Sequence, residues 1–98
     1  MTERAIRFEG GDGSAVETAI VIRGARYDLE GTRAEMEWLA QTYGQKGRDW
    51  RLVSHAHRVH DGRQIDTVVV ALADGTERRL FFDCTESFGV WPGADDRG

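Results

Sequence analysis

The chain has 98 residues, with 17 acidic and 13 basic side chains and a formal net charge of −4. Its charges alternate without a basic block, which excludes binding to a nucleic-acid backbone, and its longest apolar run, residues 68–73, is too short to span a membrane. A single cysteine allows no internal disulfide, as is usual in a reducing cytoplasm. We therefore expect one cytoplasmic domain over residues 1–92, followed by a frayed C-terminal tail, residues 93–98.

The N-terminal third predicts two short strands, residues 5–8 and 18–22, around a glycine-rich segment, residues 10–14. Glycine-rich loops that bind phosphate lead into the N-terminus of a helix. This one leads into a strand, so we interpret it as a flexible turn.

One helix is predicted to begin at Asp28, or at Thr32 with Glu35 in a capping box, and to end at Tyr43 before Gly44. At 100° per residue, one side gathers the residues expected to face the core, namely Leu29, Met36, Leu39, Ala40 and Tyr43.

Trp38 falls on the opposite, polar side of this helix, together with Ala34. Either another segment of the chain covers its ring, or the ring contacts a partner, since tryptophan is enriched at interface hot spots.

The C-terminal half predicts three strands, residues 50–59, 64–73 and 76–84, joined by Asp-Gly turns at residues 61–62 and 74–75. Asp-Gly between alternating apolar runs is a strong hairpin signal, because tight hairpin turns need positive φ angles. These strands should form an antiparallel meander.

The loop length decides which side chains share a face, because a one-residue slip turns a strand over. Two-residue loops would place Asp66 opposite both His57 and Asp83. Three-residue loops would place the apolar residues of the middle strand beside those of its neighbours, namely Val68, Val70 and Leu72 beside Trp50, Leu52, Leu80 and Phe82. We favour three-residue loops, because they give the sheet one dry face.

The predicted fold class is α+β, an antiparallel four- or five-stranded meander sheet with one amphipathic helix packed on one face. A single helix covers only one face of such a sheet. The uncovered face is expected to carry Val53, His55, His57, Val59, Val69 and Phe81. It either serves partner binding or self-association, or is only a mixed solvent-facing surface.

The sharpest chemical signal is the His55-Ala56-His57 pattern, which places two imidazoles on one face of a strand. With Asp83 on a nearby strand, they form a candidate metal site, although a zinc or iron site needs three or four converging ligands. Ordinary surface histidines are the competing interpretation. Cys84 is expected to be a small buried side chain.

Several motifs, W-R-L-V (50–53), D-G-R (61–63), A-D-G-T-E-R (73–78) and F-F-D-C-T-x-S-F-G (81–89), resemble those of small bacterial proteins without a known activity. The resemblance covers roughly residues 17–89. It implies a compact α+β domain and carries no functional residues.

No nucleophile or phosphate-binding motif occurs in the sequence, so we expect no catalytic residues and no cofactor. The predicted function is a small non-enzymatic regulatory module that binds a protein partner through Trp38, His55, His57 or Phe81. The alternatives are a metal-binding protein centred on His55 and His57, with Asp83 as third ligand, and a homodimerising domain. No small-molecule, nucleic-acid or membrane partner is expected.

Overall fold

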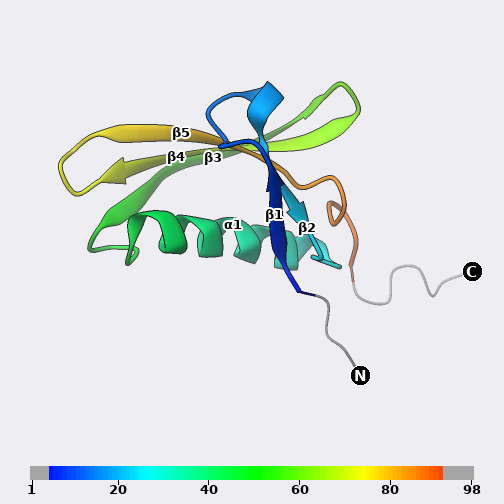
Figure 1. Cartoon of the computed structure of the whole chain (residues 1–98), viewed down its shortest axis with the longest axis horizontal. Coiled ribbons are helices and arrows are strands. Elements are labelled where there is room, and N and C mark those ends of the chain that lie inside the picture. The colour runs from blue at the N-terminus through cyan, green and yellow to red at the C-terminus, as the bar shows by residue number, and fades with distance from the viewer. Residues whose placement is uncertain (1–4, 92–98) are drawn as a thin grey trace, which may run out of the picture.

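The computed structural model describes residues 5–91, so the expected tail, residues 93–98, lies outside the described residues. The strands are β1 (Arg7–Gly10), β2 (Ile20–Arg23), β3 (Trp50–His60), β4 (Arg63–Leu72) and β5 (Glu77–Asp83), and the helix is α1 (Asp28–Tyr43). A short 3₁₀ turn, η1 (Val16–Thr18), precedes β2. The helix lies under one face of the sheet (Figure 1).

The five strands form one sheet in the order β1-β2-β5-β4-β3. The predicted α+β class is confirmed, and so is the antiparallel meander of β3, β4 and β5. Residues 20–23 join this meander through β5, and they run parallel to it, with Ile20 opposite Phe82. A parallel neighbour needs a long crossover. Here the helix and the β3–β4 hairpin both lie between β2 and β5 in the chain.

The two hairpins use different loops. The first has the two-residue loop Asp61-Gly62, with φ angles of 52° and 76°, so our preference for a three-residue loop was wrong there. Positive φ at both positions matches the right-handed twist of the strands. In the second, the Leu72 amide donates to Thr76 O at 2.7 Å, which leaves the predicted three-residue loop, with Gly75 at φ 89°.

A bulge at Val53 reconciles the two-residue loop with an apolar inner face. Leu52 pairs with Val70 and Ser54 with Val69, so Val53 has no partner on β4. An extra residue reverses the alternation of a strand. Trp50 and Leu52 before the bulge, and the two histidines after it, therefore all point towards the helix.

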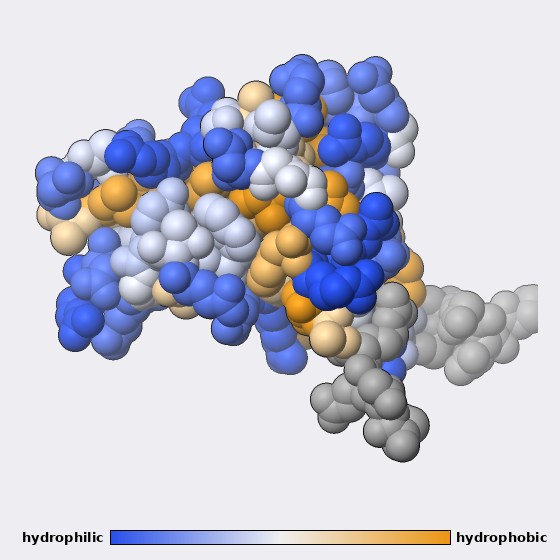
Figure 2. Space-filling model, in the orientation of Figure 1, coloured by the Kyte–Doolittle hydropathy of each residue, from blue (hydrophilic) through white to orange (hydrophobic). Residues whose placement is uncertain are grey.

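The main core lies between α1 and the inner face of the sheet. Its fully buried members come from every layer and include Ile20, Ile22, Leu39, Val68, Val70 and Phe82. In Figure 2, hydrophobic surface shows mainly in the band where the sheet and the helix meet. Among the described residues, no helix is long and apolar enough to cross a membrane.

The helix presents only part of the predicted stripe to this core. Leu39 is fully buried, and Met36 and Tyr43 pack against the core as predicted. Leu29 is 53% exposed, and the residues buried are Gly31, Ala34, Glu35 and Leu39. These positions follow the i, i+3, i+4 spacing of one helical stripe, but two of them are small and one is ionisable. Hydrophobicity alone therefore located part of the buried stripe and missed its small and ionisable members.

Trp38 lies next to this buried stripe rather than on the solvent side. Its ring meets Phe82 edge-on, with centroids 5.6 Å apart, and it also contacts Tyr43. The helix rotation that buries Glu35 thus also turns Trp38 towards the sheet.

The start of α1 has no capping side chain and is held instead by the segment that follows β5. The N-cap is Tyr27, without a side-chain hydrogen bond, and the predicted Thr32–Glu35 capping box is absent because Glu35 turns inward. Asp28 instead accepts a hydrogen bond from the Gly89 amide at 2.9 Å, and its own amide donates to Val90 O at 2.8 Å. The segment after β5 is therefore held against the helix.

The helix orientation gives a direct stability prediction. Replacing the fully buried Leu39 with alanine should lower the free energy of unfolding by about 2–5 kcal/mol, because it leaves a cavity in the core. Leu29→Ala, the matched control on the same helix, should change it by less than about 0.5 kcal/mol. Urea unfolding of both variants measures the difference, and a larger loss at Leu29 would contradict the observed rotation.

Candidate metal centre between the helix and the sheet

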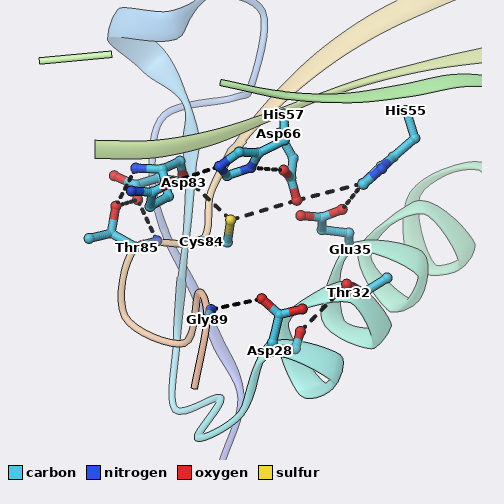
Figure 3. Close-up of polar contacts among 11 residues, drawn as sticks. Asp28, Thr32, Glu35, His55, His57, Asp66, Asp83, Cys84, Thr85 and Gly89 are labelled. Carbon is cyan, nitrogen blue, oxygen red and sulfur yellow. Dashed lines mark hydrogen bonds and ion pairs between the residues drawn. The ribbon is translucent and has the colours of Figure 1, made fainter. Parts of the chain in front are cut away.

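Both histidines of the His-Ala-His pattern face the helix, because the Val53 bulge turns this part of β3 inward. The expectation that they lie on the uncovered face was wrong. His55 Nε2 and Glu35 Oε1 share a hydrogen bond of 3.0 Å between β3 and α1 (Figure 3).

Asp66, on β4, stands at the centre of the cluster. Its Oδ1 accepts a hydrogen bond from His57 Nδ1 at 2.6 Å. Its Oδ2 lies 3.6 Å from His55 Nε2 and 3.6 Å from the sulfur of Cys84 (Figure 3). One carboxylate thus contacts three possible ligands, and its side chain is only 9% exposed.

Glu35 is the most unusual group in the cluster. It is completely buried, and its Oε2 has no hydrogen-bond partner among residues 5–91. Burial, together with the neighbouring Asp66 carboxylate, raises the pKa of Glu35 to about 10. The side chain is therefore neutral at pH 7, since an ionised carboxylate would lose its hydration without a compensating cation.

His57 holds Asp66 from the other side. Burial opposes a charge on His57, but hydrogen bonds to Asp66 and to Gln64 Oε1, the latter at 2.6 Å, outweigh it and raise the His57 pKa. The ring stacks on Phe88, with centroids 4.3 Å apart. Burial likewise opposes ionisation of Asp66, but hydrogen bonds with Glu35 and His57 outweigh it and lower the Asp66 pKa.

Cys84 is buried, as predicted. Its thiol contacts Gln64 O at 3.5 Å as well as Asp66. Burial, and then the nearby Asp66 charge, raise the pKa of the thiol. It therefore stays protonated and is a poor nucleophile without a metal ion.

Asp83 does not belong to this cluster. It pairs with Ile65 across β4 and β5, on the outer face of the sheet. There Arg63 Nε donates to its carboxylate at 2.8 Å, and Thr85 donates to its other oxygen. The predicted ligand set of His55, His57 and Asp83 is therefore not brought together.

The other predicted contact residue, Phe81, is half-buried on the outer face. It packs against a small cluster formed by Val16, Ala19 and Ile65. η1 thus covers part of the face that we expected to be open.

Two groups of potential ligands emerge within the described residues, and they share Asp66. Glu35, His55 and Asp66 place one donor atom each within 4.8 Å of one another, and so do His57, Asp66 and Cys84. The sequence pointed to Asp66 only through the two-residue-loop register, and Glu35 was missed because it interrupts an apolar stripe. Comparison of the chain with protein families, curated proteins and solved structures gives no match.

The neutral state of Glu35 predicts how stability depends on pH. With a folded pKa of about 10, above the unfolded value near 4.5, the folded state holds an extra proton between these limits. With a chelator present, the stability contributed by this group should therefore fall as pH rises above about 5, by up to about 1.4 kcal/mol per pH unit.

Glu35→Gln keeps the shape of a neutral side chain, so it should remove this slope and make the chelated protein more stable at pH 8. Glu37→Gln alters an exposed glutamate on the same helix and should leave the slope unchanged. Urea unfolding from pH 5 to 9 makes the comparison, and identical slopes in wild type and Glu35→Gln would show that Glu35 is ionised in the fold.

Proposed function

We propose that this protein binds one divalent transition-metal ion, such as Zn²⁺, through Glu35, His55 and Asp66. The observation that carries the proposal is the buried Glu35 Oε2, which has no hydrogen-bond partner in the described part of the chain. Such orphaned polar atoms are rare, and each costs about 1–3 kcal/mol unless something satisfies it. A cation bound by the Glu35 carboxylate would offset the cost of this buried group and would also offset the nearby Asp66 charge.

The spacing of the two carboxylates from the His55 nitrogen supports a small metal ion. Metal–ligand bonds of about 2.0–2.1 Å in a tetrahedral site place neighbouring donors about 3.3 Å apart. The His55 nitrogen lies 3.0 Å from Glu35 Oε1 and 3.6 Å from Asp66 Oδ2, on either side of that value. Only small shifts would therefore be needed to coordinate an ion.

The surroundings of Asp66 also fit a metal centre. Ligating carboxylates are commonly oriented by hydrogen bonds from a second shell of residues. His57 holds Asp66 Oδ1 in this way, which leaves Oδ2 for the ion, and His57 is itself fixed by Gln64 and by stacking on Phe88.

The donor chemistry selects the class of ion. Two carboxylates and an imidazole suit Zn²⁺, Mn²⁺ or Fe²⁺, whereas Ca²⁺ takes six to eight oxygen ligands and Mg²⁺ keeps most of its water. The three ligands come from α1, β3 and β4, so one ion would cross-link the helix to the sheet. Its binding would displace the proton on Glu35.

Isothermal titration of the chelator-stripped protein with Zn²⁺ should show one equivalent bound, with release of protons and a raised melting temperature. Glu35→Gln and Asp66→Asn should each abolish the binding, because each removes an anionic ligand. Measurement in two buffers of different ionisation enthalpy counts the protons released.

Asp83→Asn is the control, because it removes a carboxylate that lies on the other face of the sheet. This variant should bind Zn²⁺ with unchanged stoichiometry. Absence of binding by the wild type, or equal binding by Glu35→Gln, would leave the cluster as a buried polar network without a metal role.

A further inference from the structure

Within the part of the chain that the structure describes, strand β3 forms one edge of the sheet and pairs only with β4. Its 11 residues make it the longest strand in the described part of the chain, and residues 53–59 are all exposed. An exposed edge presents backbone N–H and C=O groups that can pair with another strand. Past the Val53 bulge, residues 54–60 keep a regular register with β4 and offer such an edge.

The charge of this edge opposes that of the whole chain. The chain carries a net charge of −4, yet β3 contains two arginines and no acidic residue. Arg58 projects from the outer face, and Arg79 of β5 lies on the same face, opposite Val69 of β4. Among residues 5–91, neither of these arginines forms an ion pair, whereas Arg63 is paired with Asp83.

These side chains border a shallow groove of about 320 Å³ on the outer face of the sheet. Its lining includes the two unpaired arginines, the hydroxyl-bearing Ser54 and Thr67, and the apolar Val69 and Phe81. The groove thus combines cationic groups, hydrogen-bonding groups and an apolar floor beside an open strand edge. This combination suits an extended anionic segment.

We propose that an acidic segment of a partner protein adds to β3 as a further antiparallel or parallel strand, with a carboxylate against Arg58 and with the charge of Arg79, two strands further into the sheet, adding to the attraction. Backbone hydrogen bonds would supply affinity, and alternate side chains would supply specificity, as in other cases of strand addition. A second copy of this chain is a poor occupant, because its β3 would bring the same arginines to the contact, and like charges across paired strands repel.

A short fluorescent peptide in which glutamate alternates with valine tests the proposal by anisotropy on the whole chain. It should bind, and increasing salt should weaken it, because the charge contacts are at the rim of the interface. Two matched peptides separate the contributions. A lysine-for-glutamate version should not bind, and a version N-methylated at alternate residues should lose most of its affinity, because it keeps the charges but not the backbone donors.

Protein variants then locate the contact. Arg58→Glu combined with Arg79→Glu should weaken binding by roughly tenfold or more, since each reversal both removes an attraction and adds a repulsion. Arg33→Glu reverses an exposed charge on α1 and should change affinity by less than about twofold. Circular dichroism confirms that each variant is folded.

Three outcomes would overturn the proposal. If the glutamate peptide does not bind, the edge does not recognise acidic segments. If the N-methylated peptide binds equally well, the peptide is held by charge attraction and not by strand addition. Light scattering that shows a dimer broken by Arg58→Glu would assign the edge to self-association instead.

Discussion

The extra residue at Val53 decides which way the two histidines point, and the candidate site depends on that direction. Without it, a two-residue loop at Asp61-Gly62 would place Trp50 and Leu52 on the face opposite His57. The strand would then bury either its large apolar residues or its histidines, but not both. With the bulge, Trp50 packs into the core near the end of the helix. Further along the same strand, His55 reaches Glu35.

Once the histidines point inward, the interior must accommodate several ionisable groups. Asp66 organises them, because its two oxygens face different partners and its charge is balanced by His57. Glu35 is more deeply buried, lies beside the Asp66 charge and keeps its proton. An apolar residue at position 35 would pack well and raise stability. The presence of a buried glutamate in a chain of 98 residues therefore favours a role that needs a carboxylate, and metal coordination fits the donors around it.

The parts of this structure that local chemistry controls could be predicted from the sequence. The Asp-Gly turns and the alternating apolar residues fixed the β3–β4–β5 meander, and Gly44 marked the helix end. The bulge could not be predicted, because Val53 is an ordinary strand residue and only the packing of its neighbours decides its place. Glu35 was missed for a related reason, since a glutamate on a helix normally faces water. Because of these two errors, the predicted metal site included Asp83 and left out Glu35.

The most direct test of the central claim is the protonation state of Glu35, read from the ¹³C chemical shift of its carboxyl group by NMR. In chelator-treated protein at pH 7 the shift should be that of a neutral carboxylic acid, and one equivalent of Zn²⁺ should change it to that of a carboxylate. A carboxylate shift before metal is added, or an acid shift that Zn²⁺ leaves unchanged, would contradict a proton that the metal ion replaces.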